Sequence, residues 1–235
     1  MGSEMCIRDR NGCIELDGSS RAVTNRYLDE LFGKRKVDSA ALPEAGLSVE
    51  QALLSGHNDD FHTHPGYHRE EHRWGHGGAA ILDYLVVADG QEYPSRIESN
   101  STTDFYFKVR FDADFDNVVP GFLIKTLEGI FLYGTNSFVS TQGREHIAAQ
   151  AGDVKVFKFS LSLALNEGYY LISFGISSGS PLQELIPLDR RYDSVLIQVG
   201  RAMQFWGIVD LEASFHAIEK PVSYTHLTLP TNREV

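Results

Sequence analysis

The chain has 235 residues, of which 42% are hydrophobic and 11% aromatic, so it can bury one substantial core. Its formal net charge of -11 argues against a nucleic-acid partner, because such proteins need clustered lysine and arginine, and a neutral or zwitterionic partner fits better. No run of 18 apolar residues occurs that would span a membrane. The only cysteines, Cys6 and Cys13, give no disulfide framework, which favours a cytoplasmic location.

Both ends of the chain lack a structural pattern. Residues 1–10 (MGSEMCIRDR) and 221–235 show neither a signal peptide nor a helical period, and they resemble adaptor read-through at the ends of assembled reading frames. We expect both ends to be non-native. Cys6 and His226 are therefore given no functional role.

Residues 11–33 predict one strand and one helix. The strand covers 11–18 between two glycine turns, and the helix covers 22–32 and ends at Gly33. These two elements are too few for a core, so we interpret 11–33 as the remnant of a larger domain. Their order resembles the C-terminal end of the ATPase domain in polysaccharide exporters. The chain lacks the phosphate-binding sequence G-x-x-x-x-G-K-[ST], so we expect no ATP hydrolysis.

Residues 34–72 are interpreted as a linker, with a short helix expected over 47–54. This region and its C-terminal border contain His57, His62, His64, His68, His72 and His76. His62-Thr63-His64 with Glu70 fits a cupin-type metal site, but Pro65-Gly66 breaks the element that would hold the ligands. We expect polar linker histidines and keep the metal site as the weaker alternative.

The sequence changes character at Arg73-Trp74-Gly75-His76-Gly77-Gly78, and residues 73–220 have a β pattern. Short apolar runs separated by turns predict strands over 79–88, 103–112, 122–127, 130–133, 154–165, 169–176, 192–199 and 206–217. Glu128-Gly129 predicts a hairpin turn, and a change of phase between Val156 and Phe157 predicts a β-bulge. Seven to eight strands without helices between them predict an all-β fold, an immunoglobulin-like antiparallel β-sandwich, preceded by the helical remnant and the linker.

Two strands carry more detailed predictions. In 103–112, Phe105, Phe107, Val109 and Phe111 alternate with Tyr106, Lys108 and Arg110, which predicts one buried face and one solvent-exposed face. Asn166-Glu167-Gly168-Tyr169-Tyr170 matches a tyrosine corner, in which the hydroxyl of Tyr170 bonds back across the turn. The alternative is an ordinary strand aromatic; in either case Tyr170 is structural.

Several motifs together carry a family resemblance. They are Arg73-Trp74-Gly75-x-Gly77-x-Ala79, Gly134-Thr135-Asn136-Ser137, Gly168-x-Tyr170-x-Ile172-Ser173-x-Gly175 and Tyr192-Asp193. In this order they resemble the C-terminal domain of the Wzt family, the ATP-binding subunits of ABC exporters for O-antigen polysaccharides. The resemblance covers about residues 67–218, with 11–33 as the end of the ATPase domain.

The resemblance implies a non-catalytic carbohydrate-binding domain that needs no cofactor. It implies recognition of the non-reducing end of the O-antigen polysaccharide, which selects finished chains for export. It also implies a homodimer, with exchange of an edge strand as one route, and a membrane permease as partner through the ATPase domain. The protein would then lie on the cytoplasmic side of the inner membrane.

Sugar binding combines aromatic faces with polar groups on a rigid surface. Candidate ligand-binding residues chosen on this basis are Tyr106, Arg110, Tyr133, Asn136, Arg190 and Trp206. Each also has a structural interpretation: Lys and Arg protect strand edges, Trp206 caps the core, and Asn136 makes an Asx turn. Trp74 is interpreted as a packing anchor.

Two other function classes remain open at this point. One is a pure dimerisation or assembly domain of the transporter subunit. The other is a jelly-roll, metal-dependent sugar enzyme, but the strands contain no clustered acid and base. Asp112, Asp114 and Asp116 form an acidic loop that would suit Ca²⁺, although an ordinary acidic turn is the better interpretation.

Overall fold

The computed structural model describes residues 5–10, 13–19, 53, 56, 58–180, 182 and 184–218. The helix expected over 22–32 and the C-terminal residues 221–235 lie outside the described residues. In the described part of the chain, no helix is long and apolar enough to cross a membrane.

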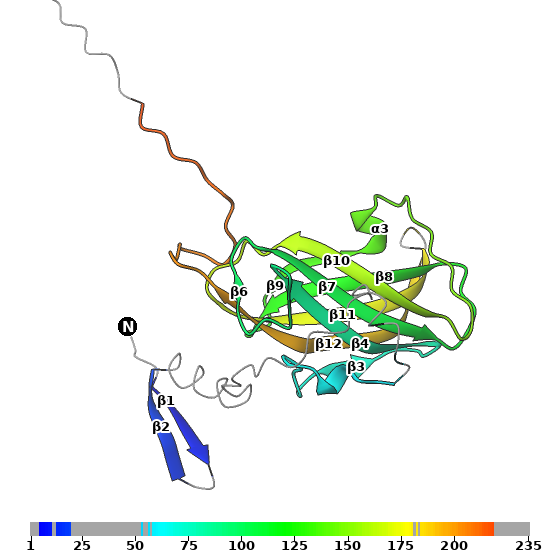
Figure 1. The fold of residues 1–235 in the computed structure, drawn as a ribbon, viewed down its shortest axis with the longest axis horizontal. Helices are drawn as coiled ribbons and strands as arrows, with labels where there is room; N and C mark the ends of the chain where they lie inside the picture. The colour runs from blue at the N-terminus through cyan, green and yellow to red at the C-terminus, as the bar shows by residue number, and fades with distance from the viewer. Residues whose placement is uncertain are drawn as a thin grey trace, which may run out of the picture.

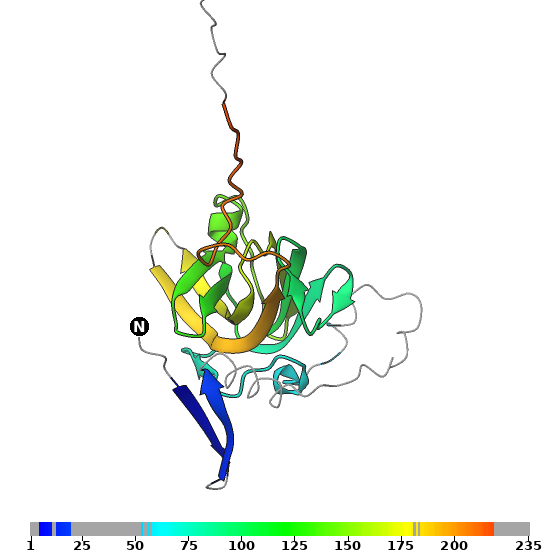
Figure 2. The same cartoon turned by 90° about the vertical axis from the view of Figure 1, so that its left-hand side faces the viewer.

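Two β-sheets pack face to face (Figures 1 and 2). The smaller sheet has the order β10-β7-β4-β5, formed by β10 (Val154–Ser162), β7 (Thr102–Phe111), β4 (Ala79–Ala88) and β5 (Gln91–Glu92). The larger has the order β3-β12-β11-β8-β9, formed by β3 (His72–Trp74), β12 (Glu184–Gly200), β11 (Gly168–Ser180), β8 (Val118–Thr126) and β9 (Phe131–Asn136). Strand β6 (Ile97–Glu98) adds to β12 in parallel, and all the other pairs are antiparallel. The expected all-β, immunoglobulin-like sandwich is confirmed.

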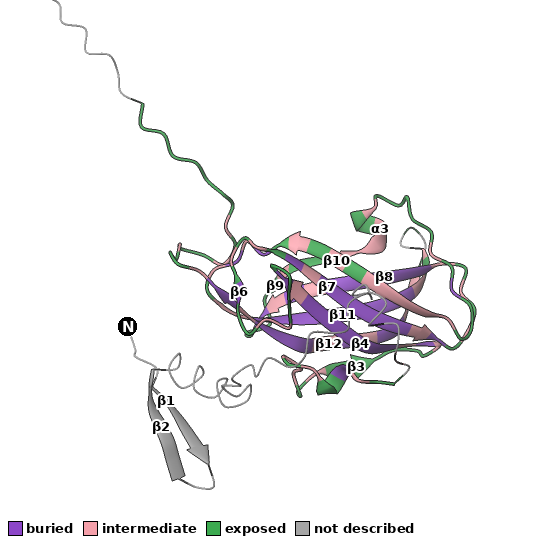
Figure 3. Cartoon of the chain, in the orientation of Figure 1, coloured by how far each residue is buried: buried purple, intermediate pink, exposed green. Residues whose placement is uncertain are grey.

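The core lies between the two sheets (Figure 3). Phe107 of β7 packs against Phe174 of β11, with ring centroids 5.0 Å apart, and Phe122 of β8 contacts both sheets. The alternating aromatic residues predicted for the inner face of β7 are all fully buried. This dense aromatic layer makes the larger sheet a rigid support for its outer face.

The hairpin and the tyrosine corner are confirmed. Strands β8 and β9 meet at a turn in which Gly129 has a φ of 86° and donates its N–H to the carbonyl of Thr126. The hydroxyl of Tyr170 donates to the carbonyl of Asn166 at 2.8 Å. Tyr170 is buried and belongs to the core, as the motif predicts.

The bulge predicted between Val156 and Phe157 is wrong. The register of β10 with β7 runs without a shift from Val154 opposite Arg110 to Ser162 opposite Thr102. Phe157 packs against the core, whereas Val156 packs against a separate cluster on the outer face of the same sheet. Apolar residues thus stand on both faces of β10, which the sequence pattern shows as a change of phase.

The exposed face predicted for β7 is also wrong, because Tyr106 is 5% exposed and Lys108 only 1%. Strand β7 lies inside its sheet, and residues from the middle of the expected linker cover its outer face. Leu53 packs with Tyr106, and the Lys108 ammonium donates to the carbonyl of Gly56 at 3.0 Å and pairs with Asp83 at 3.3 Å. Leu53 and Gly56, far upstream in the sequence, thus bury the outer face of β7, which the alternating pattern of the strand alone does not indicate.

Residues 58–72, expected to be linker, pack on the sandwich. A short 3-10 helix (Phe61–Thr63) places Phe61 fully inside the core. Buried Arg191 of β12 holds the same segment through ion pairs with Asp59 at 2.8 Å and Glu71 at 3.2 Å. The packed structure therefore begins upstream of residue 73. We call residues 58–74 the N-terminal strap.

Residues 206–217 do not form the predicted strand. Between 201 and 218 the chain makes a single isolated bridge, from Val209 to Leu165, and Figure 1 shows the end of this segment running away from the sandwich. The alternating pattern is present in the sequence, but a strand also needs a hydrogen-bonded neighbour along its length, and one copy of the described chain supplies only this bridge.

Near the N-terminus, β1 (Met5–Arg10) and β2 (Cys13–Ser19) form an antiparallel hairpin. The second strand matches the strand expected over 11–18. The first was not predicted, since residues 1–10 were set aside.

Candidate functional site

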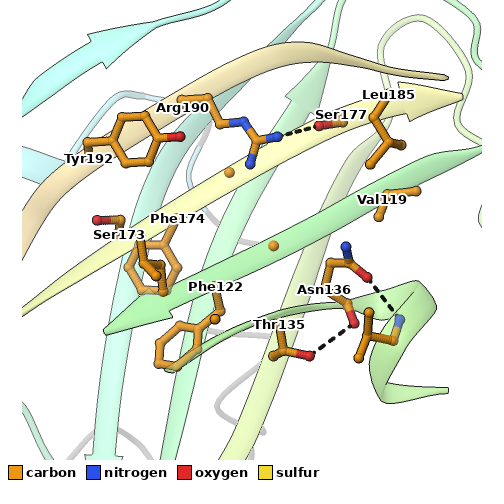
Figure 4. A pocket seen from close by; sticks show the side chains of 15 residues that line it. Val119, Phe122, Thr135, Asn136, Ser173, Phe174, Ser177, Leu185, Arg190 and Tyr192 are labelled. Carbon is orange, nitrogen blue, oxygen red and sulfur yellow. Dashed lines mark hydrogen bonds between the residues drawn. The ribbon is translucent and has the colours of Figure 1, made fainter. Parts of the chain in front are cut away.

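A hollow of about 240 Å³ lies on the outer face of the larger sheet (Figure 4). Strands β8, β9, β11 and β12 form its floor and sides, and Val139 of the short helix α3 (Ser137–Ser140) stands at its edge. It is lined by Val119, Gly121, Phe122, Leu123, Gly134, Thr135, Asn136, Val139, Ser173, Phe174, Gly175, Ser177, Leu185, Arg190 and Tyr192.

One row of residues runs across four strands of this hollow. Asn136 of β9 is opposite Gly121 of β8, Gly121 is opposite Gly175 of β11, and Gly175 is opposite Arg190 of β12. Residues directly opposite one another on paired strands share a face. The row therefore has polar side chains at both ends and two glycines between them as its floor.

Glycine is needed at 175 because Arg190 lies across it. A Cβ at Gly175 would come within 2.5 Å of Nη1 and 2.7 Å of Cδ of Arg190, whereas a Cβ at Gly121 would be 3.7 Å from Nη1. A glycine inside a strand weakens the strand and marks a close approach of another group. Here that group is the guanidinium of Arg190.

Arg190 has no carboxylate partner among the described residues. Its Nη2 donates to the hydroxyl of Ser177 at 2.8 Å, and its buried Nε has no hydrogen-bond partner. By contrast, the neighbouring cations Arg191 and Lys125 are ion-paired, with Glu71 and Asp193 respectively. The Arg190 guanidinium thus keeps donors available for a ligand.

Asn136 closes the opposite end of the row. Its Oδ1 accepts a hydrogen bond from the N–H of Val139, three residues on, at 2.9 Å, so Asn136 caps helix α3 in place of the Asx turn considered from the sequence. In Figure 4 its amide nitrogen points away from α3. The cap fixes the side chain and leaves the amide group to donate to a ligand.

Tyr192 reaches the hollow because it lies two residues after Arg190 on β12 and therefore on the same face. The register with β11 shifts between Ile172 and Phe174, and the N–H of Asp193 donates to the hydroxyl of Ser173 at 2.8 Å. Asp193 has a positive φ of 57°. This irregularity directly follows Tyr192, whose ring lines the hollow beside Arg190.

Of the six candidate residues, the structure brings only Asn136 and Arg190 together. Tyr133 is opposite buried Ile124, on the other side of β9 from Asn136. Tyr106 and Arg110 belong to the smaller sheet, where Arg110 pairs with Asp112 at 2.9 Å.

Trp206 lies fully exposed in the segment after β12, so it neither begins a strand nor caps the core. The residues missed from the sequence are Gly121, Gly175, Ser177 and Tyr192. Gly175, inside the strand predicted over 169–176, was the available signal for a close approach on one sheet face, whereas Gly121 falls just before the strand predicted over 122–127.

The histidines and the acidic loop have structural contacts. The ring of His64 hydrogen-bonds Asp83 at 2.6 Å, and His68 hydrogen-bonds the carbonyl of Asp193 at 2.8 Å. Asp114 accepts the N–H of Ala151 at 2.8 Å. The described residues contain no cluster of three or more His, Cys, Asp or Glu suited to a metal ion.

Comparison with known proteins identifies the family. The model of the Wzt C-terminal domain matches residues 70–211. This chain belongs to the Wzt C-terminal domain family. A solved structure of the C-terminal domain of Wzt is 55% identical, with a TM-score of 0.69, and the match covers 70% of this chain and 99% of that chain.

Other solved structures are far less similar. The CARDB domain of a Pyrococcus furiosus protein is 13% identical with a TM-score of 0.30, covering 50% of this chain and 87% of that one. A β-glucosidase from Listeria innocua is 11% identical with a TM-score of 0.29, covering 57% of this chain and 17% of that one. Such low similarity says nothing of the function of this Wzt domain. None of the curated proteins compared with the chain matches it.

Proposed function

We propose that this Wzt domain binds the non-reducing end of an O-antigen polysaccharide in the hollow on the larger sheet, and so selects chains for export by the ABC transporter. The observation that carries this proposal is the row Asn136-Gly121-Gly175-Arg190, a glycine floor between two polar groups. Membership of the Wzt family supports the polysaccharide as the ligand class.

The chemistry of the hollow suits a sugar ring. A guanidinium presents several N–H donors in a fixed plane and can bind two neighbouring hydroxyl groups at once. Asn136 adds an amide donor from the other side, and Tyr192 adds an aromatic ring. The volume of about 240 Å³ is below the roughly 300–1,000 Å³ of sites for drug-sized ligands, which suits one terminal sugar unit.

Binding without catalysis is the activity that this lining favours. The residues around the hollow include no aspartate, glutamate, histidine or cysteine, so the hydroxyl groups that line it have no carboxylate or imidazole base among the lining residues to activate them as nucleophiles. This composition favours a binding module over the metal-dependent sugar enzyme considered from the sequence.

The test is titration calorimetry of the full chain with oligosaccharides cut from the non-reducing end of the O-polysaccharide of its source bacterium. We expect saturable binding without hydrolysis, and a loss of about tenfold or more in Arg190→Ala, because a charge-assisted hydrogen bond contributes about 1.5–3 kcal/mol. Asn136→Asp is the matched variant at the other end: it keeps an oxygen to cap α3 but removes the amide donor, and we expect weaker binding with an unchanged melting temperature.

Parent protein that binds none of these oligosaccharides, or an Arg190→Ala variant that binds them as well as the parent, would overturn the proposal. Release of free sugar during the titration would favour an enzyme instead.

We also propose that the domain forms a homodimer through the segment after β12. Six large apolar side chains of the described part of this segment are exposed in one copy: Met203, Trp206, Val209, Leu211, Phe215 and Ile218. An unpaired segment with alternating apolar residues is suited to adding a strand to an edge of a second copy. Contact with the membrane permease, on the cytoplasmic side, would run through the ATPase domain of the exporter subunit.

A further inference from the structure

We infer that the binding face continues beyond the hollow onto Trp74, which together with Tyr192 forms a second subsite for the sugar unit next to the terminal one. This inference rests on the proposed function and extends it, because it assigns part of the ligand contact to the N-terminal strap. In the sequence Trp74 is a packing anchor; in the structure it is 40% exposed.

The register of β3 places Trp74 on the same face as the hollow. Trp74 is opposite Arg190, so the row across the larger sheet extends to Asn136-Gly121-Gly175-Arg190-Trp74 over five strands. Neighbouring strands lie about 5 Å apart, so one strand step past Arg190 is close to the width of a sugar ring. A glycan that lies along the row passes from the hollow directly onto the indole.

The aromatic pair forms a continuous surface. The rings of Trp74 and Tyr192 have centroids 6.3 Å apart and planes inclined by 32°. Tyr192 lines the hollow, whereas Trp74 lies just outside it, so the two rings connect the first subsite to the second. Aromatic faces of this kind pack against the C–H groups of a pyranose, and tryptophan supplies a large contact area with few rotatable bonds.

The backbone that carries Trp74 is held firmly. The adjacent Arg73 points the other way and grips Asp189 with two hydrogen bonds, of 2.8 and 3.1 Å, while its third nitrogen pairs with Asp59 at 2.9 Å. After Trp74, the N–H groups of His76 and Gly77 donate to carbonyls of β12 at 3.0 Å. An exposed indole on a fixed backbone loses little freedom on binding, which favours ligand contact.

The polar surroundings of Trp74 favour a sugar over an apolar protein surface. On the neighbouring strand β12, Arg190 lies opposite Trp74. On β3 itself, His72 lies two residues before Trp74 and opposite Tyr192. The side chains of Arg190 and His72 both form hydrogen bonds, as the hydroxyl groups around a sugar ring require.

The test compares oligosaccharides of one, two and four sugar units from the non-reducing end of the O-polysaccharide, titrated into the full chain and its Trp74→Ala variant. In the parent we expect affinity to rise about tenfold from one unit to two. In Trp74→Ala we expect the one-unit affinity of the parent and loss of most of the gain for two units. Trp206→Ala, the same change at the other tryptophan of the chain, is the control for glycan binding: Trp206 does not line the hollow, so both affinities should equal those of the parent even where the change weakens the proposed dimer.

The results separate the two proposals. If the parent binds one unit but Trp74→Ala keeps the full gain for two, the second subsite is wrong and the hollow stands. If Trp74→Ala lowers one-unit and two-unit binding equally, the indole acts on the hollow and the second subsite is again wrong. Parent protein that binds no length overturns the proposed function and the inference together.

Tryptophan fluorescence gives an independent readout. In Trp206→Phe, Trp74 is the one remaining tryptophan. We expect two-unit glycan to shift its emission and to protect it from acrylamide quenching, and one-unit glycan to do so much less. Unchanged emission and quenching at saturating two-unit glycan would overturn the inference.

Discussion

At the scale of single residues, Arg190 keeps its place because Gly175 has no side chain. The guanidinium lies over the glycine and reaches Ser177 on the same strand. We expect Gly175→Ala to displace Arg190, because the new methyl group would lie 2.5 Å from Nη1. Glycan affinity measured by calorimetry should fall about as far as in Arg190→Ala.

The double variant Gly175→Ala/Arg190→Ala is the control, and it should bind no more weakly than Arg190→Ala alone, since both changes remove the same contact. Gly121→Ala tests whether the fold tolerates an alanine in this row, because its methyl group would lie 3.6 Å from its nearest neighbour, an ordinary van der Waals contact. A Gly175→Ala variant with parental affinity would contradict this account of the glycine floor.

Tyr170 acts on stability alone. Its hydroxyl closes the tyrosine corner with a 2.8 Å hydrogen bond to the carbonyl of Asn166. We expect Tyr170→Phe to lower the free energy of unfolding by about 1 kcal/mol, the usual net contribution of such a bond, and to leave glycan binding unchanged. Urea denaturation measures the first effect and calorimetry the second; an unchanged urea midpoint would contradict the structural role.

At the scale of elements, the outer face of the smaller sheet is held by a buried charge cluster. Asp83 of β4 contacts His64 of the strap at 2.6 Å and Lys108 of β7 at 3.3 Å. Burial favours the neutral acid, but the hydrogen bond from His64 and the charges of His64 and Lys108 outweigh it and hold the pKa of Asp83 below its usual value. A lowered pKa means that the folded state prefers the charged form.

This preference gives a pH dependence of defined sign. The contribution of Asp83 to stability is complete above its unfolded pKa of about 4 and is lost as the pH falls through the lower folded-state value. We expect Asp83→Asn to lower stability by about 3 kcal/mol at pH 7, because it leaves the ammonium of Lys108 buried without a counter-charge. The gap between parent and variant should narrow as the pH falls from 4 to 2.

Urea midpoints at pH 7, 4 and 2 measure this gap. Asp112→Asn is the control, since Asp112 forms an exposed pair with Arg110 and should change stability by less than about 1 kcal/mol at any of these pH values. A gap between parent and Asp83→Asn that stays constant with pH would contradict the assignment.

The sequence predicted the position of a strand where the apolar pattern and the turn residues of that strand are local. The strand predicted over 79–88 coincides with β4, and the hairpin of β8 and β9 was marked by Glu128-Gly129. The outer face of β7 was not readable, because its cover comes from Leu53 and Gly56, about fifty residues upstream. Contacts between segments that are distant in the sequence do not change the hydrophobic periodicity of either segment, so neither segment indicates them.

For the site as well, the sequence indicated residue types but did not indicate which residues lie close together. Asn136 and Arg190 were selected for their residue types, but their neighbourhood depends on the order β9-β8-β11-β12, which no single strand reveals. Tyr106 and Arg110 satisfied the same criteria and belong to the other sheet. Tyr192 lies two residues after Arg190 on β12 and lines the hollow from the same face. Residue type was predictable, whereas convergence on one face required the strand order.

At the scale of the whole molecule, the hollow differs in charge from the rest of the chain. The net charge is -11, yet the lining contains Arg190 and no acidic residue. A single arginine on a protein of negative net charge favours a few directed hydrogen bonds to a sugar. It does not favour the many electrostatic contacts that binding a polyanion needs. This agrees with the composition, which argues against nucleic acid as partner.

The segment after β12 gives a second test at this scale. If it adds to an edge of another copy, Leu211→Asp/Phe215→Asp should shift the full chain from dimer to monomer in sedimentation velocity, because charged side chains cannot be buried there without a partner. Ser214→Asp/Glu212→Gln, in the same segment, is the control for a polar change. Parent protein that sediments as a monomer would contradict the proposed homodimer.

The central claim is that the glycan end lies in the hollow of the larger sheet, and the most direct test is a crystal structure of the full chain with a two-unit oligosaccharide from the non-reducing end. We expect the terminal ring over Gly121 and Gly175, with hydroxyl groups within hydrogen-bond distance of Arg190 and Asn136. A glycan bound instead on the outer face of the smaller sheet, beside Arg110, would contradict it.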